Sequence, residues 1–167
     1  MQWEKELATL NQQAILELAK QFSVTATQEF HFIIERAEGP FVWDREGRRY
    51  FDFYSGVGVA NLGYKIPEIR EAIVRQLDSG VLNFDDNLWP NPWATLLRKR
   101  LSEATPGRFP KKVFLSNSGA EAIEAAIKIL VGNRPERTSF IAFDGAFHGR
   151  TGYALALNGS KIAHRKY

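Results

Sequence analysis

The 167-residue sequence has no cysteine and only three histidines. Without cysteine the chain can form no disulfide framework and has no thiolate nucleophile. The histidines, His31, His148 and His164, are far apart and lack the spacing of metal ligands, so we expect no metal site. A GxSxG motif is also missing, which argues against a serine hydrolase of the α/β type.

The sequence also lacks a long apolar run and a strong charge of one sign. No stretch approaches the roughly 20 apolar residues that a membrane-spanning helix needs, and the first residues lack the apolar core of a signal peptide. The net charge of +3 is small and spread along the chain, and we interpret the basic tail, residues 161–166, as a solvated loop. We therefore expect a cytoplasmic protein that binds neither membranes nor nucleic acid.

The first half of the chain shows several periodic segments. Apolar spacing predicts an amphipathic helix over 2–21, a short strand over 30–35 and a hairpin over 41–53 that turns at 44–47. Two more helices are expected to begin at Pro67 and at Asn91-Pro92, because proline suits the first helical position. We expect their apolar stripes to be buried; these are Ile69, Ile73 and Leu77 in the first, and Trp93, Leu96, Leu97 and Leu101 in the second.

The second half alternates between strand-like and helical patterns. Residues 112–116 predict a strand, 119–131 a helix and 139–143 another strand, followed by a glycine-rich loop and a short helix over 151–157. This order is typical of a parallel strand-helix-strand unit in an α/β protein.

The start of the helix at 119 has the features of an anion site. Ser118 suits the N-cap, and Glu121 completes a capping-box pattern, which by itself could be no more than a good helix start. The free N–H groups of a first helical turn also favour a phosphate, and Gly119 and Ala120 have almost no side chain to block it. No lysine follows in the P-loop arrangement, so the phosphate would belong to a ligand other than a nucleoside triphosphate.

The loop after the second predicted strand, Gly145–Arg150, adds an aromatic ring and a cation. Both loops leave the carboxyl ends of strands, where open α/β sheets bind ligands. Phe147 could be a core residue, His148 a loop histidine and Arg150 a solvated charge. Together, however, a phosphate site, an aromatic face and a carboxylate-binding guanidinium fit pyridoxal phosphate with an amino-acid substrate.

From about residue 25 onward the sequence resembles the class III (ornithine/4-aminobutyrate type) pyridoxal-phosphate aminotransferases. The resemblance is carried by Ser118–Ala122 and Gly145–Thr151, together with the upstream stretches 42–67 and 101–118. The resemblance implies the N-terminal part of the type I pyridoxal-phosphate transferase fold. Residues 1–58 would belong to the small domain, and 59–167 would begin the large domain with its mainly parallel sheet. The activity implied is amino transfer from 4-aminobutyrate, ornithine, acetylornithine or a related amine to 2-oxoglutarate, by a homodimer.

The same resemblance implies roles for individual residues. The cofactor phosphate would be held by Ser118, Gly119 and Ala120. Phe147 would stack on the pyridine ring with His148 beside it, Arg150 would meet a substrate carboxylate, and Val57 would line the substrate pocket.

The resemblance also implies that the Schiff-base lysine and the aspartate that pairs with the pyridine nitrogen lie beyond Tyr167. Lys161 and Lys166 lack the expected surroundings of that lysine. Transamination requires the lysine, so we expect this chain to hold no catalytic residue, to be a fragment and to be inactive alone.

Two alternatives remain. The glycines at 56, 58 and 63 follow a strand-like run, but they miss the GxGxxG spacing of a nicotinamide-binding domain. The other alternative is a non-catalytic binding or regulatory module derived from half an aminotransferase.

Overall fold

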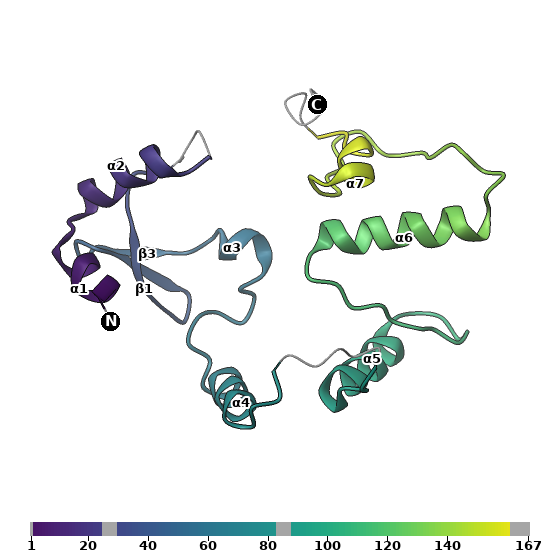
Figure 1. The fold of residues 1–167 in the computed structure, drawn as a ribbon, viewed down its shortest axis with the longest axis horizontal. Helices are drawn as coiled ribbons and strands as arrows, with labels where there is room; N and C mark the ends of the chain where they lie inside the picture. The colour runs from purple at the N-terminus through teal and green to yellow at the C-terminus, as the bar shows by residue number, and fades with distance from the viewer. Residues whose placement is uncertain (1, 25–29, 83–87, 161–167) are drawn as a thin grey trace. The chain divides into compact units, whose positions relative to one another are not determined.

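The computed structural model describes residues 2–24, 30–82 and 88–160, and Figure 1 shows the chain. It divides into two compact units, Met1–Asn83 and Phe84–Tyr167. The predicted boundary at residues 58 and 59 concerns the domains of an intact transferase and stays a prediction. The basic tail lies outside the described residues.

Two helices open the first unit, where the sequence predicted one. Helix α1 spans Gln2–Thr9 and α2 spans Gln12–Phe22. The break occurs because the Asn11 side chain accepts a hydrogen bond from the backbone N–H of Ala14 at 2.8 Å and so caps a new helix. The continuous helix over 2–21 was therefore wrong, because apolar spacing continues across the break.

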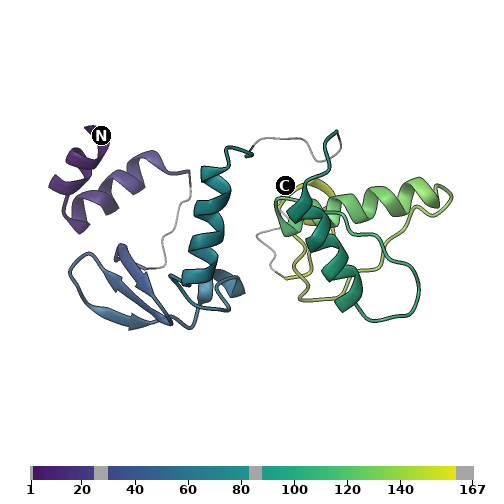
Figure 2. The same ribbon diagram turned by 90° about the horizontal axis from the view of Figure 1, so that it is seen from below.

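A three-stranded antiparallel sheet follows, with β1 (Ile34–Glu38), β2 (Phe41–Asp44) and β3 (Arg49–Phe51) in that order (Figure 2). The predicted hairpin is confirmed as β2 and β3, with Phe41 opposite Phe51. Gly47 closes the turn with a φ of +82°, a conformation that glycine adopts without strain. The strand expected over 30–35 forms further along the chain, as β1.

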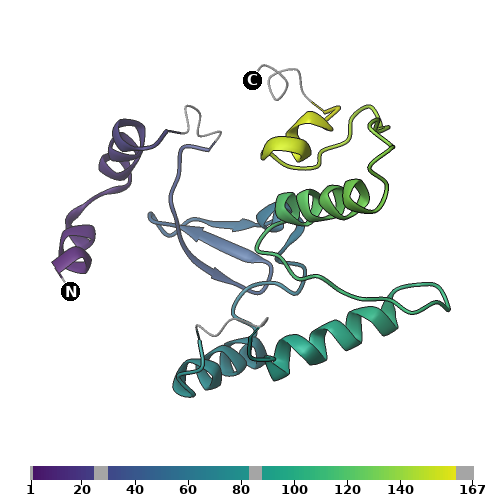
Figure 3. The ribbon, with the colours of Figure 1, turned by 45° about the vertical axis from the view of Figure 1, so that its right-hand side comes forward.

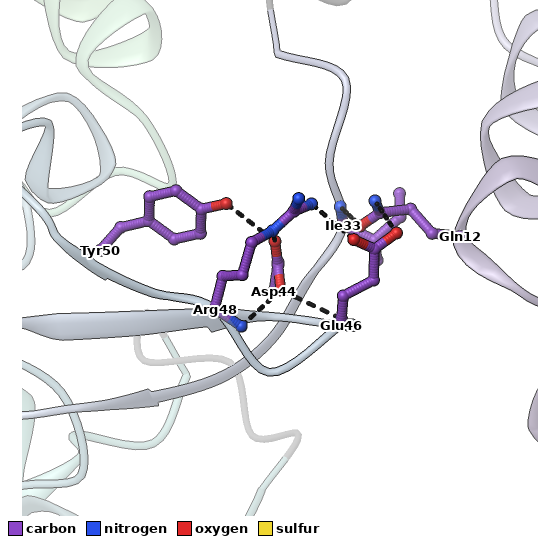
Figure 4. Close-up of polar contacts among 6 residues, drawn as sticks. All are labelled: Gln12, Ile33, Asp44, Glu46, Arg48 and Tyr50. Carbon is purple, nitrogen blue, oxygen red and sulfur yellow. Dashed lines mark hydrogen bonds and ion pairs between the residues drawn. The ribbon is translucent and has the colours of Figure 1, made fainter.

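The buried carboxylate of Asp44 organises this turn (Figure 4). Its Oδ1 accepts from the backbone N–H groups of Glu46 and Arg48, and its Oδ2 accepts from Arg48 Nε at 2.7 Å and from the Tyr50 hydroxyl at 2.8 Å. Burial alone would raise the pKa of Asp44, but the hydrogen bonds from Arg48 and Tyr50 outweigh it and lower the pKa to about 2.

The turn also fastens the N-terminal helices to the sheet. Gln12 Oε1 accepts from the N–H of Ile33 at 2.9 Å, and Gln12 Nε2 donates to Glu46 at 3.1 Å (Figure 4). Arg45 donates to the carbonyl of Leu7 at 2.7 Å, near the end of α1. These long-range polar contacts carry no sequence pattern, and the sequence did not predict them.

The first unit ends with α3 (Ser55–Gly58) and α4 (Pro67–Asp78). Pro67 occupies the first turn of α4 as predicted. The stripe that we expected to be buried is half exposed, with Ile69 at 46% and Ile73 at 56%. The apolar spacing of α4 thus marks a helix, but burial would require a covering layer that the described part of the unit does not provide.

The second unit contains α5 (Pro92–Ala104), α6 (Gly119–Asn133) and α7 (Gly152–Ala156). Asn91 caps α5 by accepting from the N–H groups of Trp93 and Ala94. The apolar residues of α5 that we expected to point inward are also exposed, Trp93 most of all. Helices α6 and α7 pack against each other, as Figures 1 and 3 show.

The two strands expected beside α6 do not form within the described residues. Residues 112–116 and 139–143 belong to no strand or helix, although exposure alternates with a period of two from Lys111 to Ser116. Ile141 is 97% exposed and Phe143 82% exposed. A strand needs a ladder of backbone hydrogen bonds to a second strand, and among the described residues no strand pairs with either segment. The strand-helix-strand unit is therefore present only as its helix.

No helix within the described ranges is long and apolar enough to cross a membrane.

Candidate functional site

The N-cap of α6 forms as predicted. Ser118 is extended, and its Oγ accepts from the backbone N–H of Glu121 at 3.2 Å. The return bond differs from a standard capping box, because Glu121 Oε2 accepts from the N–H of Asn117 at 2.8 Å, one residue before the cap. Glu121 thus binds the backbone that leads into the helix, at Asn117, and not the backbone N–H of the cap residue Ser118.

The first turn of α6 has the features of an anion site. Helix geometry leaves its first N–H groups without intrahelical acceptors, with the positive end of the helix dipole behind them. Apart from the adjacent residues and the backbone of α6 itself, no heavy atom lies within 4 Å of the position where a Cβ of Gly119 would lie. The Ser118 hydroxyl accepts from Glu121, so its own hydrogen stays available to donate to a bound oxygen.

Gly149 brings the loop Gly145–Arg150 onto this turn. Its φ is +140°, and a Cβ built on it would lie 2.6 Å from the Cβ of Ala120 and 2.9 Å from its Cα. Only glycine permits so close an approach. The two motifs that the sequence singled out, Ser118–Ala122 and Gly145–Thr151, therefore meet at the start of α6.

Phe147 and Arg150 project from this loop. Phe147 is 55% exposed, so it is not a core residue, and the guanidinium carbon of Arg150 lies 5.9 Å from its ring centroid. The ring offers an apolar face, and the exposed guanidinium offers paired donors to an anion such as a carboxylate. His148 is half buried, and its backbone N–H is bonded to Asn158.

Two residues that the sequence did not single out for the site hold this loop. Asn158 binds the backbone at His148 and Gly149. Glu124 accepts from the Thr151 hydroxyl at 2.9 Å and the Ala154 N–H at 3.0 Å, and these two bonds, the backbone bond first, lower the pKa of Glu124. The sequence could have indicated Glu124, because its carboxylate lies beside Ile123 and Ile127 on the packed side of α6. Asn158 carried no such signal, because its role depends on its burial against the loop.

Val57 lies in the first unit, on α3. Its φ is +63°, in the left-handed region that β-branched residues rarely occupy, and its side chain is 74% exposed. Ser55 and Gly56 are left-handed as well. Such backbone is costly to hold and is often found at functional sites, but Val57 is not among the residues gathered at α6.

Among the described residues, no group of three or more histidine, aspartate or glutamate side chains is placed to hold a metal ion.

Comparison with known proteins gives a consistent result. A family model described as aminotransferase class-III matches residues 22–167. Mitochondrial acetylornithine aminotransferase from Yarrowia lipolytica is 38% identical over 151 residues, which cover 86% of this chain and 36% of that protein. 2-Aminoadipate transaminase from Pseudomonas putida is 44% identical over 125 residues, which cover 75% of this chain and 29% of that protein.

A solved structure agrees. Adenosylmethionine-8-amino-7-oxononanoate aminotransferase from Methanocaldococcus jannaschii matches with a TM-score of 0.80 at 31% identity, over 92% of this chain and 37% of that one. The chain thus spans about a third of the length of the curated relatives it matches. The α/β fold class, as an N-terminal part of the type I transferase fold, is confirmed by these neighbours.

Proposed function

The chain belongs to the class-III aminotransferase family, and we propose that it forms the phosphate- and ring-binding part of a pyridoxal-phosphate-dependent aminotransferase. The observation that carries this proposal is the approach of Gly149 to Ala120. It places the first turn of α6 beside the loop that carries Phe147 and Arg150.

The residues present fit the cofactor. Ser118, Gly119 and Ala120 offer a hydroxyl and the N–H groups of a helix start to a phosphate, with no bulky side chain in the way. Phe147 presents a ring face for stacking, with His148 next to it. When bound, pyridoxal phosphate supplies an aldehyde for amino-group exchange and a ring that takes up electrons.

The substrate-binding roles follow from charge and position. Arg150 would bind a carboxylate of the amino acid or keto acid through its paired N–H donors, and Val57 would line the pocket that the intact protein completes. We propose an ω-amino acid or diamine donor of the 4-aminobutyrate, ornithine or acetylornithine class, with 2-oxoglutarate as acceptor. The name of the Yarrowia relative supports the ornithine branch of this class.

We further propose that the chain is part of a longer or split enzyme, since it matches only about a third of its relatives' length. The Schiff-base lysine would lie in the other part, and the intact enzyme would be a homodimer.

We also propose that the protein is located in the cytoplasm. Cell fractionation tests this location, and recovery of the protein in mitochondria would overturn it.

Cofactor binding is tested on the chain itself by NMR titration with pyridoxamine 5′-phosphate. This probe has no aldehyde, so it cannot react with the many surface lysines. Amide shifts should move at Gly119 and Ala120 and beside Phe147, and Ser118→Ala should weaken binding. Shifts confined to other segments would contradict the proposed site.

Turnover is tested separately. The 167-residue chain should not exchange amino groups between 4-aminobutyrate, ornithine or acetylornithine and 2-oxoglutarate, because we propose that the lysine that moves the proton lies in the other part. The intact protein should do so with at least one donor. Turnover by the chain alone would refute its status as a fragment. A stop codon directly after Tyr167, with no second half nearby in the genome, would instead favour the non-catalytic module.

A further inference from the structure

Asn158 is 3% exposed, and its side chain bridges two backbone groups of the Gly145–Arg150 loop. Its Oδ1 accepts from the N–H of His148 at 2.6 Å, and its Nδ2 donates to the carbonyl of Gly149 at 2.7 Å. Both groups lie on the stretch of backbone between Phe147 and Arg150. One planar amide thus fixes the residues that separate the proposed ring-stacking and carboxylate-binding side chains.

The backbone after Asn158 extends this contact. The N–H of Gly159 donates to the carbonyl of Ala146 at 2.9 Å. A Cβ on Gly159 would lie 2.5 Å from the carbonyl oxygen of Phe143, so the two segments approach too closely for any residue other than glycine at 159. Residues 158–159 therefore brace the loop from Ala146 to Gly149.

The opposite side of the loop is fixed by α6. Gly149 rests on Ala120, and Glu124 binds the Thr151 hydroxyl and the Ala154 N–H. The loop backbone is thus held between Asn158 and α6, while the Phe147 ring and the Arg150 guanidinium remain exposed.

We propose that Asn158 is a positioning residue, which sets the backbone at His148 and Gly149 so that Phe147 and Arg150 project beside the start of α6. This inference rests on the proposed cofactor site. The position needs one acceptor and one donor on a short side chain. Asparagine supplies both, aspartate supplies two acceptors when ionised, and alanine supplies neither.

Three variants of the full chain test this: Asn158→Ala, Asn158→Asp and the matched control Asn133→Ala, which removes an asparagine from the exposed end of α6. Two quantities are measured by NMR, the hydrogen-exchange rate of the His148 amide and the dissociation constant for pyridoxamine 5′-phosphate. Asn158→Ala should exchange faster and bind about tenfold more weakly or worse, because two buried backbone groups lose their partners. Asn133→Ala should match wild type in both.

Asn158→Asp adds a readout that simple loss of packing would not move. Near neutral pH its carboxylate faces the Gly149 carbonyl and should weaken binding. At about pH 5, a carboxyl group buried there should be protonated and donate again, so affinity relative to wild type should recover. The neighbouring groups Glu124, Asp144 and His148 are present in wild type and in every variant, so affinity is compared with wild type at each pH. Asn158→Ala should show no recovery.

The outcomes separate the two proposals. If wild type does not bind the probe, the proposed function fails and this inference falls with it. If wild type binds and Asn158→Ala binds equally well, the positioning role alone is overturned. Should Asn158→Ala fail to fold, Asn158→Asp decides, because recovery at low pH supports the role and its absence overturns it.

Discussion

Gly149 is the residue on which the geometry of the site depends most directly. It lacks a side chain where a Cβ would lie 2.6 Å from Ala120, and its φ of +140° suits no other residue. Both features act on the same contact between the loop and α6. Any substitution there must move the loop away from the helix.

We expect Gly149→Ala to destabilise the second unit by about 1–3 kcal/mol, through strain and overpacking. It should also weaken binding of pyridoxamine 5′-phosphate about tenfold or more, since Phe147 moves with the loop. Urea unfolding and NMR titration measure the two effects. Gly132→Ala is the control, because Gly132 lies in α6 and a Cβ there would meet nothing within 4 Å beyond its chain neighbours and the helix's own backbone. Equal behaviour of the two variants would contradict this account of the contact.

At the scale of single elements, the β2–β3 hairpin depends on one charge. Asp44 is buried in the turn and accepts four hydrogen bonds, two from the backbone and one each from Arg48 Nε and the Tyr50 hydroxyl. Because Glu46 and Arg45 of the same turn hold the N-terminal helices, loss of the turn would also release α1 and α2.

The hairpin should therefore lose stability in acid. The pKa of Asp44 in the folded chain is about 2, below its ordinary value of 3.8. Because its pKa is lowered by folding, ionised Asp44 stabilises the fold fully above about pH 4. This contribution to stability disappears as the pH falls toward about 2. The protection factors of the Glu46 and Arg48 amides, which correct for the pH dependence of intrinsic exchange, should fall over that range.

Asp44→Asn should lower these protection factors already at neutral pH and remove most of their change between about pH 4 and 2. Asp78→Asn, at the exposed end of α4, serves as the control and should leave both unchanged. Exchange that stays slow in Asp44→Asn at neutral pH would show that the turn does not need the charge.

At the scale of the whole molecule, much apolar surface is uncovered. Phe114, Ile141 and Phe143 are all more than 65% exposed, and they lie in the two segments that were expected to pair in a sheet. Unpaired apolar segments of this kind are an aggregation hazard.

We expect the isolated chain to self-associate as its concentration rises, which analytical ultracentrifugation measures. Ile141→Lys should reduce this association, whereas Leu62→Lys, an equally drastic change at an exposed position of the first unit, should reduce it less. A monomer that melts sharply and cooperatively at all concentrations would contradict the expectation.

The sequence by itself determined the family, the helix starts at Pro67, Asn91 and Ser118, the hairpin, and the two motifs of the candidate site. These features are local: a cap, a turn glycine or a proline acts within a few residues, so its signal survives without a tertiary structure. The same reasoning failed at Asn11, because continuous apolar spacing concealed a second cap.

Tertiary structure alone decided which apolar faces are covered, and that Gly149 rests on Ala120 while Asn158 and Glu124 brace the loop. Burial and long-range hydrogen bonds depend on what lies opposite a residue, and neighbours in sequence do not specify this. For the same reason residues 112–116 keep the alternating exposure of a strand without forming one, since a sheet requires a second backbone alongside.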